Sequence, residues 1–176
     1  MEDKPIPKSY PQASSSNTPQ HPQTIPIAFI SGPQDIDAAY FETHYIPPIK
    51  NAIAQGHRFI LGPSRGVDAF ALDYLRKSGL PTSRIRLYLN TSEETRVKPI
   101  FRRFEEAGGS VVMVKGGHAE RDEMMTRNSH YDILRNRTEE EARALYGELY
   151  MKNVSGAEMN ALRRKSGVGL VLPKSQ

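Results

Sequence analysis

The chain has 176 residues, a formal net charge of +4 and a hydrophobic fraction of 38%. This length accommodates one well-cored domain and excludes two full ones, because domains most often hold about 100–150 residues. Cysteine is absent, which excludes disulfides, thiolate metal sites and a cysteine nucleophile and favours a cytoplasmic location. No apolar stretch approaches the ~20 residues that span a bilayer, and no signal peptide is recognisable, so we expect a soluble protein.

The positive charge favours anionic partners, but lysine and arginine are scattered along the chain rather than clustered. A phosphorylated small ligand therefore explains the charge as well as nucleic acid does. Because basic clusters and aromatic pairs for base stacking are missing, binding of nucleic acid through the surface is disfavoured. The expected partner is a nucleotide or a nucleoside-derived small molecule.

Three parts of the chain differ in composition. Residues 1–24 are rich in Pro, Ser, Gln and Asn and are expected to be a disordered tail, because they lack the apolar side chains that offset the entropy of ordering a backbone. Residues 25–170 have the patterning of one globular domain, and residues 171–176 form a short C-terminal tail.

Within the domain, short apolar runs alternate with segments of helical period. The predicted strands are residues 25–30, 57–61, 84–89, 110–114 and, as a short strand or its remnant, 131–134. The first predicted helix is capped by Asp35 or Asp37, and Pro47 and Pro48 break or restart it. Further helices are predicted over residues 67–77, 97–107, 119–129 and 138–150, and Ser155 caps a last one. This alternation predicts an α/β fold: a single Rossmann-like three-layer domain with a mostly parallel sheet and extra C-terminal helices.

Ligands of open parallel sheets bind at the carboxyl ends of the strands, near the point where the strand order reverses. The loops that follow the predicted strands are therefore the candidate sites. After the first strand, Gly32 allows a ligand to approach the backbone, and Ser31 or Gln34 can form a hydrogen bond to it. A plain turn explains the same residues equally well.

The turn after the second predicted strand contains Gly62, Ser64, Arg65, Gly66 and Asp68. Backbone N–H groups at a helix start, a hydroxyl and a guanidinium converge there, as phosphate recognition requires. In this interpretation Asp68 either caps the helix or binds a ribose hydroxyl. A glycine-rich connector with an aspartate cap is the alternative, and the motif alone does not separate the two.

The loop after the fourth predicted strand places His118, Arg121 and Asp122 near a helix start. The Arg121 guanidinium is a candidate clamp for an anion, with Asp122 beside it as a further ligand-binding candidate. His118 has the chemistry of a general base. A lone histidine in a solvated glycine-rich loop is nevertheless more often without a catalytic role.

The segment Ser155-Gly156-Ala157-Glu158-Met159-Asn160 has two interpretations. Ser155 and Glu158 lie at capping-box spacing, which by itself accounts for both. In the functional interpretation, Ser155 and Gly156 form a second anion-binding helix start, and Glu158 or Asn160 reaches a ribose. No His pair at helix spacing, acidic cluster or Ser-His-Asp arrangement is recognisable, so no metal or cofactor is predicted.

Together, these motifs resemble the SLOG superfamily. The resemblance rests on residues 27–32, on the turn 62–68 with Ala71, and on Arg121-Asp122-Glu123-Met124-Met125 ahead of residues 131–134. The superfamily comprises Rossmann-like domains of cytokinin-activating phosphoribohydrolases, DNA-processing proteins and small nucleotide sensors, and nucleoside deoxyribosyltransferases are similar in layout. The resemblance implies binding of a nucleotide or nucleotide-derived ligand at residues 62–68, with Arg121 completing the pocket, and a homodimer.

The chain departs from this family after residues 131–134. The Pro-Gly-Gly-x-Gly-Thr turn of the phosphoribohydrolases is missing there, and residues 155–160, which lie beyond the inserted helix 138–150, have a similar character. If they replace that turn, Glu158 is the candidate catalytic carboxylate, acting on the anomeric carbon of a ribosyl group as nucleophile or electrostatic stabiliser. The alternative function is therefore an enzyme that cleaves or transfers at an N-glycosidic bond, of the hydrolase or nucleoside deoxyribosyltransferase type.

Overall fold

The computed structural model describes residues 24–152 and 154–172, so nearly all of the predicted N-terminal tail and residues 173–176 of the predicted C-terminal tail lie outside the described residues. The strands are β1 (Ile27–Ser31), β2 (Arg58–Leu61), β3 (Ile85–Asn90), β4 (Ser110–Val114) and β5 (Tyr131–Leu134). The α-helices are α1 (Ala38–His44), α2 (Ile46–Ala54), α3 (Val67–Lys77), α4 (Arg102–Glu106), α5 (His118–Arg127), α6 (Glu139–Tyr146) and α7 (Gly156–Lys165). Short 3₁₀ helices are η1 (Thr82–Arg84), η2 (Thr91–Glu93), η3 (Lys98–Phe101) and η4 (Gly147–Leu149).

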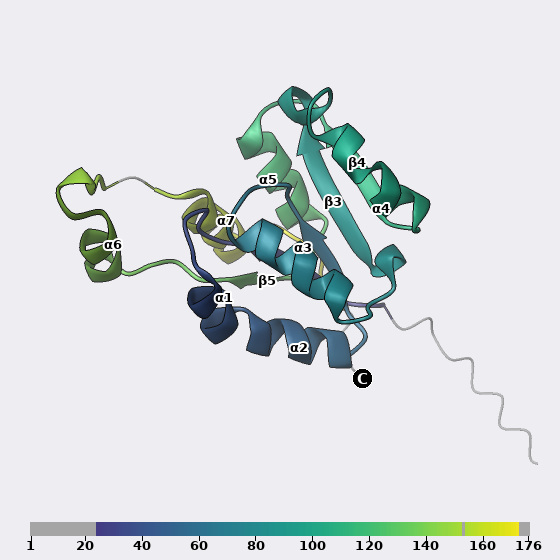
Figure 1. Cartoon of the computed structure of the whole chain (residues 1–176), viewed down its shortest axis with the longest axis horizontal. Coiled ribbons are helices and arrows are strands. Elements are labelled where there is room, and N and C mark those ends of the chain that lie inside the picture. The colour runs from purple at the N-terminus through teal and green to yellow at the C-terminus, as the bar shows by residue number, and fades with distance from the viewer. Residues whose placement is uncertain (1–23, 153, 173–176) are drawn as a thin grey trace, which may run out of the picture.

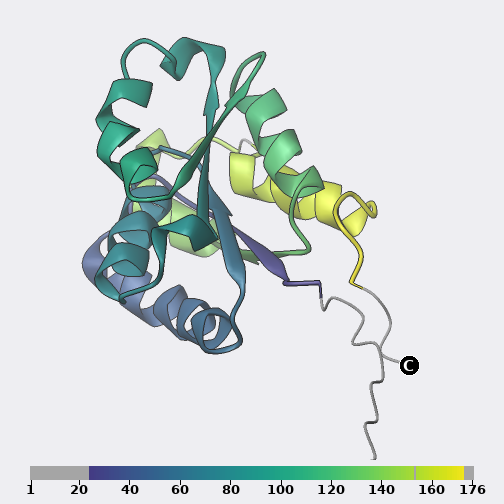
Figure 2. The ribbon, with the colours of Figure 1, turned by 90° about the vertical axis from the view of Figure 1, so that its right-hand side faces the viewer.

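The five strands form one all-parallel sheet in the order β4-β3-β2-β1-β5. Helices α1 to α4 cover one face of this sheet, and α5 and α7 cover the other (Figure 2). Successive side chains of a strand point to opposite faces of the sheet. In β1, Ala28 and Ile30 belong to the large core under α1 to α4, whereas Phe29 packs with Met125 of α5 on the other face. Burial on both faces explains why the strands read as continuous apolar runs. The predicted α/β, Rossmann-like three-layer fold is confirmed.

The topology determines where the loops meet. The chain proceeds outward from β1 through β2 and β3 to β4, and then returns to place β5 on the other side of β1. The strand order therefore reverses between β1 and β5. The loops that follow β1, β2 and β5 converge at the carboxyl edge beside this reversal, which is where ligands of open parallel sheets bind.

Two predicted helices differ from the structure. Residues 97–107 are divided into η3 and α4, and Pro99 lies in the first turn of η3, where its missing N–H costs no helical hydrogen bond. The helix predicted over 138–150 ends at Tyr146, where Gly147 takes a positive φ of 54°, and η4 follows. Its predicted start is confirmed, since Thr138 and Glu141 form a capping box. Pro47 and Pro48 restart a helix rather than end one, because they lie in the first turn of α2.

Residues 138–152, which contain α6 and η4, project from the layered body and are called the arm below (Figure 1). No residue of α6 is buried. Four large hydrophobic side chains of the arm are exposed: Leu145, Tyr146, Leu149 and Met151. Within the described part of the chain, no helix has both the length and the apolar composition needed to cross a membrane.

Candidate functional site

A cavity of 670 Å³ opens at the carboxyl edge, among the loops after β1, β2 and β5, the starts of α5 and α7, and the arm. It brings together most of the residues singled out in the sequence: Gly32, Gln34, Ser64, Arg65, Asp68, Arg121, Asp122, Ser155, Gly156, Glu158 and Asn160. Gly62 and Gly66 are not among the residues that line it. Arg65 and Gln34 are exposed, whereas Asp68, Arg121 and Asn160 are buried.

Gly66 joins the loops after β1 and β2. It adopts φ 74° and ψ −128°, and a Cβ atom there would lie 2.5 Å from both the Gln34 Cα and the Pro33 carbonyl oxygen. Beside it, the Val67 N–H donates to the Pro33 carbonyl oxygen (3.1 Å). The glycine therefore serves the approach of two backbones to each other, a role that its place in a phosphate-type motif did not reveal.

Asp68 closes the turn after β2. Its Oδ2 accepts a hydrogen bond from the Ser64 N–H (3.2 Å), and a Cβ atom at Gly62 would meet the same oxygen at 2.7 Å. Gly62 is thus needed because the Asp68 carboxyl lies against its backbone. The prediction that Asp68 caps α3 is wrong, because the residue that precedes the helix is Gly66 and Asp68 lies in its first turn.

The electrostatics of Asp68 are unusual for a carboxyl. Burial raises its pKa from 3.8 to about 7, and Asp122 adds to the rise, while the Arg121 guanidinium and the hydrogen bond from Ser64 oppose it. Near neutral pH this group therefore exists in both protonation states. It can donate a hydrogen bond to a ligand oxygen in one state and accept one from a hydroxyl in the other.

Arg121 lies beneath the cavity at 4% exposure. Its Nη1 donates to Glu93 Oε1 (2.9 Å), and its Nε and Nη2 donate to Asp122 Oδ1 (3.1 and 3.0 Å). The guanidinium is thus already paired with two carboxylates, which offset the charge that an anion clamp would use. Glu93 also forms a capping box at the start of η2, in which its Oε2 accepts a hydrogen bond from the Asn90 N–H. Because the capping box accounts for this glutamate, the sequence did not identify it as a partner of Arg121.

The start of α7 confirms the predicted capping box. Ser155 Oγ accepts from the Glu158 N–H (3.1 Å), and Glu158 Oε2 accepts from the Ser155 N–H (2.6 Å). Glu158 is half-buried and lines the cavity, so the capping role and the predicted role at the ligand fall on one residue. Asn160 Nδ2 lies 3.5 Å from Ser31 Oγ, which ties α7 to the end of β1.

The loop after β5 contributes residues that the sequence analysis did not select. The Tyr45 hydroxyl donates to the Ser31 carbonyl oxygen (3.0 Å) and accepts from the Arg135 N–H (3.1 Å), which fastens the carboxyl ends of β1 and β5 together. Next to it, Asn136 lines the cavity, and its Oδ1 is buried with no hydrogen-bond partner among the described residues. A polar run directly after a strand at the reversal point was the only signal for this loop.

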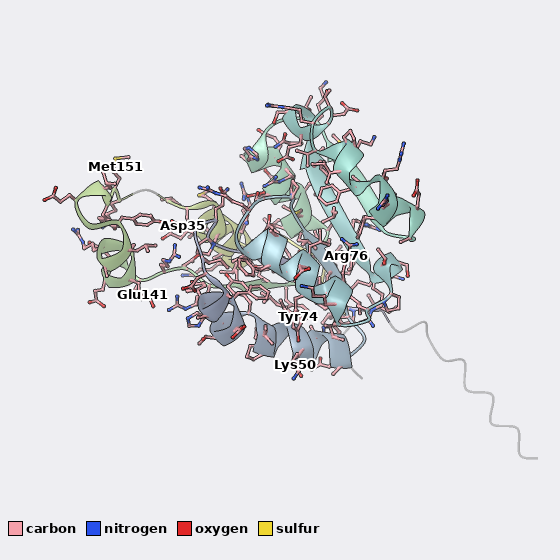
Figure 3. All side chains as sticks on the ribbon, in the orientation of Figure 1. Asp35, Lys50, Tyr74, Arg76, Glu141 and Met151 are labelled. Carbon is pink, nitrogen blue, oxygen red and sulfur yellow. The ribbon has the colours of Figure 1, made fainter. Side chains whose placement is uncertain are left out.

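The arm is fastened to the body beside the cavity (Figure 3). Arg137 Nη1 donates to Asp35 Oδ1 (2.6 Å), and the Tyr146 hydroxyl donates to Asp35 Oδ2. Partial burial works to raise the pKa of Asp35, but the hydrogen bonds from Tyr146 and Arg137 outweigh it and leave the pKa below its usual value. Arg135 forms a second link, since its guanidinium donates to Glu141 of α6 (2.5 Å).

His118 lies outside the lining of the cavity. Its Nδ1 is 2.9 Å from Asn90 Nδ2 and 3.7 Å from Glu93 Oε1. No group of three or more potential metal ligands is present in the residues that the structure describes.

Comparisons with protein-family models, curated proteins and solved structures found no match for the chain.

Proposed function

We propose that the chain binds a nucleotide or a nucleotide-derived small molecule in the cavity at the carboxyl edge of the sheet. The observation that carries the proposal is the position of the cavity at the reversal between β1 and β5, with the start of α3, Ser64 and Arg65 in its wall. In this proposal the turn 62–68 holds the phosphate or the ribose.

Each group in that turn has a suitable chemistry. The dipole of the eleven-residue helix α3 favours an anion at its start. Of the N–H groups there, that of Val67 already donates to the Pro33 carbonyl oxygen. The exposed Arg65 can move to contact a phosphate, since its guanidinium is a planar donor of several hydrogen bonds. The carboxyl of Asp68 suits a ribose hydroxyl, because that hydroxyl both donates and accepts. The resemblance to the SLOG superfamily supports the same assignment.

A thermal-shift screen of nucleosides, nucleotides and dinucleotides tests this proposal, because a ligand that binds only the folded protein raises its melting temperature. We expect a nucleotide to raise it, and Arg65→Ala to reduce the shift. Arg76→Ala is the matched control, since Arg76 is also exposed but lies in the last turn of α3, at the end away from Arg65. A screen without a hit, or equal effects of the two substitutions, would contradict the proposal.

An enzyme acting on an N-glycosidic bond is the second candidate, and the place of Glu158 in the wall of the same cavity favours it. In hydrolysis, the bond between C1′ and the base nitrogen breaks, a water oxygen bonds to C1′, and the base leaves with a proton. Glu158 would stabilise the positive charge that develops on the sugar.

The substitution Glu158→Gln tests this second candidate while keeping the helix start intact, because glutamine also serves in capping boxes. Release of free base by the unaltered protein, with unchanged nucleotide binding but no release by Glu158→Gln, supports an enzyme. Binding without release of base by the unaltered protein supports a sensor.

A further inference from the structure

Among the described residues, five cationic side chains line the cavity, and four of them already form ion pairs with carboxylates. The five are Arg65, Arg121, Arg135, Arg137 and Lys152. The pairs are Arg121 with Glu93 (2.9 Å) and Asp122 (3.0 Å), Arg135 with Glu141, Arg137 with Asp35 (2.6 Å), and Lys152 with Glu139 (4.0 Å). Arg65 is exposed and has no carboxylate partner within the described part of the chain. A phosphate in this cavity therefore finds its counter-charge at Arg65, on the rim.

The floor of the cavity carries carboxyls instead. Asp68 and Asp122 both line it, with 9% of Asp68 and 17% of the Asp122 side chain exposed. Arg121 brings them into one cluster. A Cβ atom at Gly62 would lie 2.7 Å from Asp68 Oδ2 and 3.3 Å from Arg121 Cζ, and Arg121 Nη2 donates to Asp122 Oδ1. Because Glu93 shares the same guanidinium, one positive charge faces three carboxyls, and none is left for a phosphate.

The start of α7, which also lines the cavity, has carboxylates of its own. Glu158 Oε2 accepts from the Ser155 N–H (2.6 Å), and Asp122 Oδ2 lies 3.5 Å from the position of a Cβ atom at Gly156. Negative side chains at a helix start offset its dipole. An anion there would meet like charges, which cost free energy when they are brought together away from bulk water. A ligand hydroxyl, in contrast, can donate to these carboxylates.

One turn joins the rim to the floor. The Ser64 N–H donates to Asp68 Oδ2 (3.2 Å), and Arg65 is the next residue. The Cα atom of Arg65 therefore lies within about 8 Å of that oxygen. A sugar phosphate fits this span, because the flexible arginine side chain can approach the phosphate while the sugar hydroxyls contact the carboxyl.

We infer that Asp68 and Asp122 form a subsite for the hydroxyl groups of the ligand's sugar, and that this subsite excludes a phosphate on those hydroxyls. The inference rests on the proposed function and adds the orientation of the ligand and a rule of selection. The 2′ and 3′ hydroxyls of a nucleoside 5′-monophosphate lie against the two carboxyls, and its phosphate lies at Arg65. Ligands phosphorylated at the 2′ or 3′ position are rejected, because that phosphate would be placed against the carboxyls.

The test uses isothermal titration calorimetry with the full-length protein at pH 8, which lies above the raised pKa of Asp68. The ligands are the four common nucleosides, their 5′-monophosphates, their 3′-monophosphates, their 3′,5′-bisphosphates and the 2′,3′-dideoxy 5′-monophosphates. Asp68→Asn and Arg65→Ala are the test variants, and Asp73→Asn is the control. Asp73 is an exposed residue of α3 that does not line the cavity. Circular dichroism checks that each variant folds.

We expect at least one 5′-monophosphate to bind about tenfold or more tightly than its 3′,5′-bisphosphate and than its dideoxy form. Asp68→Asn should reduce the discrimination against the bisphosphate several-fold, because one of the opposing charges is gone. Arg65→Ala should weaken binding of the 5′-monophosphate but leave the affinity for the nucleoside within about twofold. Asp73→Asn should behave like the unaltered protein.

Two outcomes on the unaltered protein would overturn the inference and leave the proposed function standing: a bisphosphate that binds as tightly as the 5′-monophosphate, or a 3′-monophosphate that binds more tightly. Equal discrimination by the unaltered protein and a folded Asp68→Asn would overturn it as well. If Asp68→Asn does not fold, the comparison of ligands on the unaltered protein still decides. Absence of binding by every nucleotide would overturn both the inference and the proposed function.

Discussion

Replacing Asp68 by asparagine should remove a large part of the pH dependence of folding stability near neutrality. Asp68 lies at the base of the cavity, where burial raises its pKa from 3.8 to about 7. An acid whose pKa is higher in the folded protein binds more protons there than in the unfolded chain. Stability from this group is therefore fully present below about pH 4 and is lost as pH rises from the unfolded value through the folded one.

The magnitude follows from the two pKa values, 3.8 and about 7. One pKa unit corresponds to about 1.4 kcal/mol, so between pH 5 and pH 8 this carboxyl lowers the free energy of unfolding by about 2.5 kcal/mol. Asparagine has nearly the same shape, has no charge to desolvate and can still accept the hydrogen bond from the Ser64 N–H. The free energy of unfolding of Asp68→Asn should thus fall about 2.5 kcal/mol less than that of the unaltered protein over this range.

Urea denaturation at pH 5, 6, 7 and 8 measures the effect, and only the difference in slope between the two proteins matters, so any constant offset from the substitution cancels. Asp73→Asn is the control, because Asp73 is an exposed residue of the same helix that pairs with Lys77. Parallel pH profiles for Asp68→Asn and the unaltered protein would refute the assignment of a raised pKa to this group.

Three further substitutions test the packing around the cavity. Gly66→Ala should lower the free energy of unfolding by about 2–4 kcal/mol, because its Cβ would meet backbone atoms at 2.5 Å. Gly56→Ala, which is also at positive φ but in open space, should lower it by about 1 kcal/mol. Equal melting temperatures of the two variants would contradict this. Arg121→Leu should cost about 3–5 kcal/mol in urea denaturation, because two carboxylates lose their buried partner, and a loss under 1 kcal/mol would count against the network. Tyr146→Phe removes the hydrogen bond to Asp35, so limited cleavage by trypsin within the arm should become several-fold faster. In the control Tyr150→Phe, the arm should be cleaved at the rate of the unaltered protein.

The sequence predicted the layers of the fold because its periodicities are strong. Residues 67–77 have an amphipathic helical period and form α3, and residues 110–114 and 131–134 are strands with the predicted bounds. Alternation of strands and helices also predicted parallel pairing. The order of the strands was not predictable, because the return of the chain to place β5 beside β1 depends on packing among helices far apart in sequence.

The candidate site was predictable only in part. The loop 62–68 and the start of α7 have recognisable motifs, and both reach the cavity. Asn136 has no motif, since its interest comes from a buried, unpartnered oxygen that only the fold creates. The pairing of Arg121 with Glu93 was equally hidden, because 28 positions separate the two residues and a capping box already accounts for Glu93.

The central claim is that the carboxyl edge between β1 and β5 binds a nucleotide. Mapping of backbone amide chemical shifts by NMR during titration with nucleoside 5′-monophosphates tests it most directly. The largest changes are predicted at Gly32, at residues 64–68 and in the arm, with smaller ones in α4 and at the amino ends of the strands. Changes centred on another surface, or none at millimolar ligand, would contradict the claim.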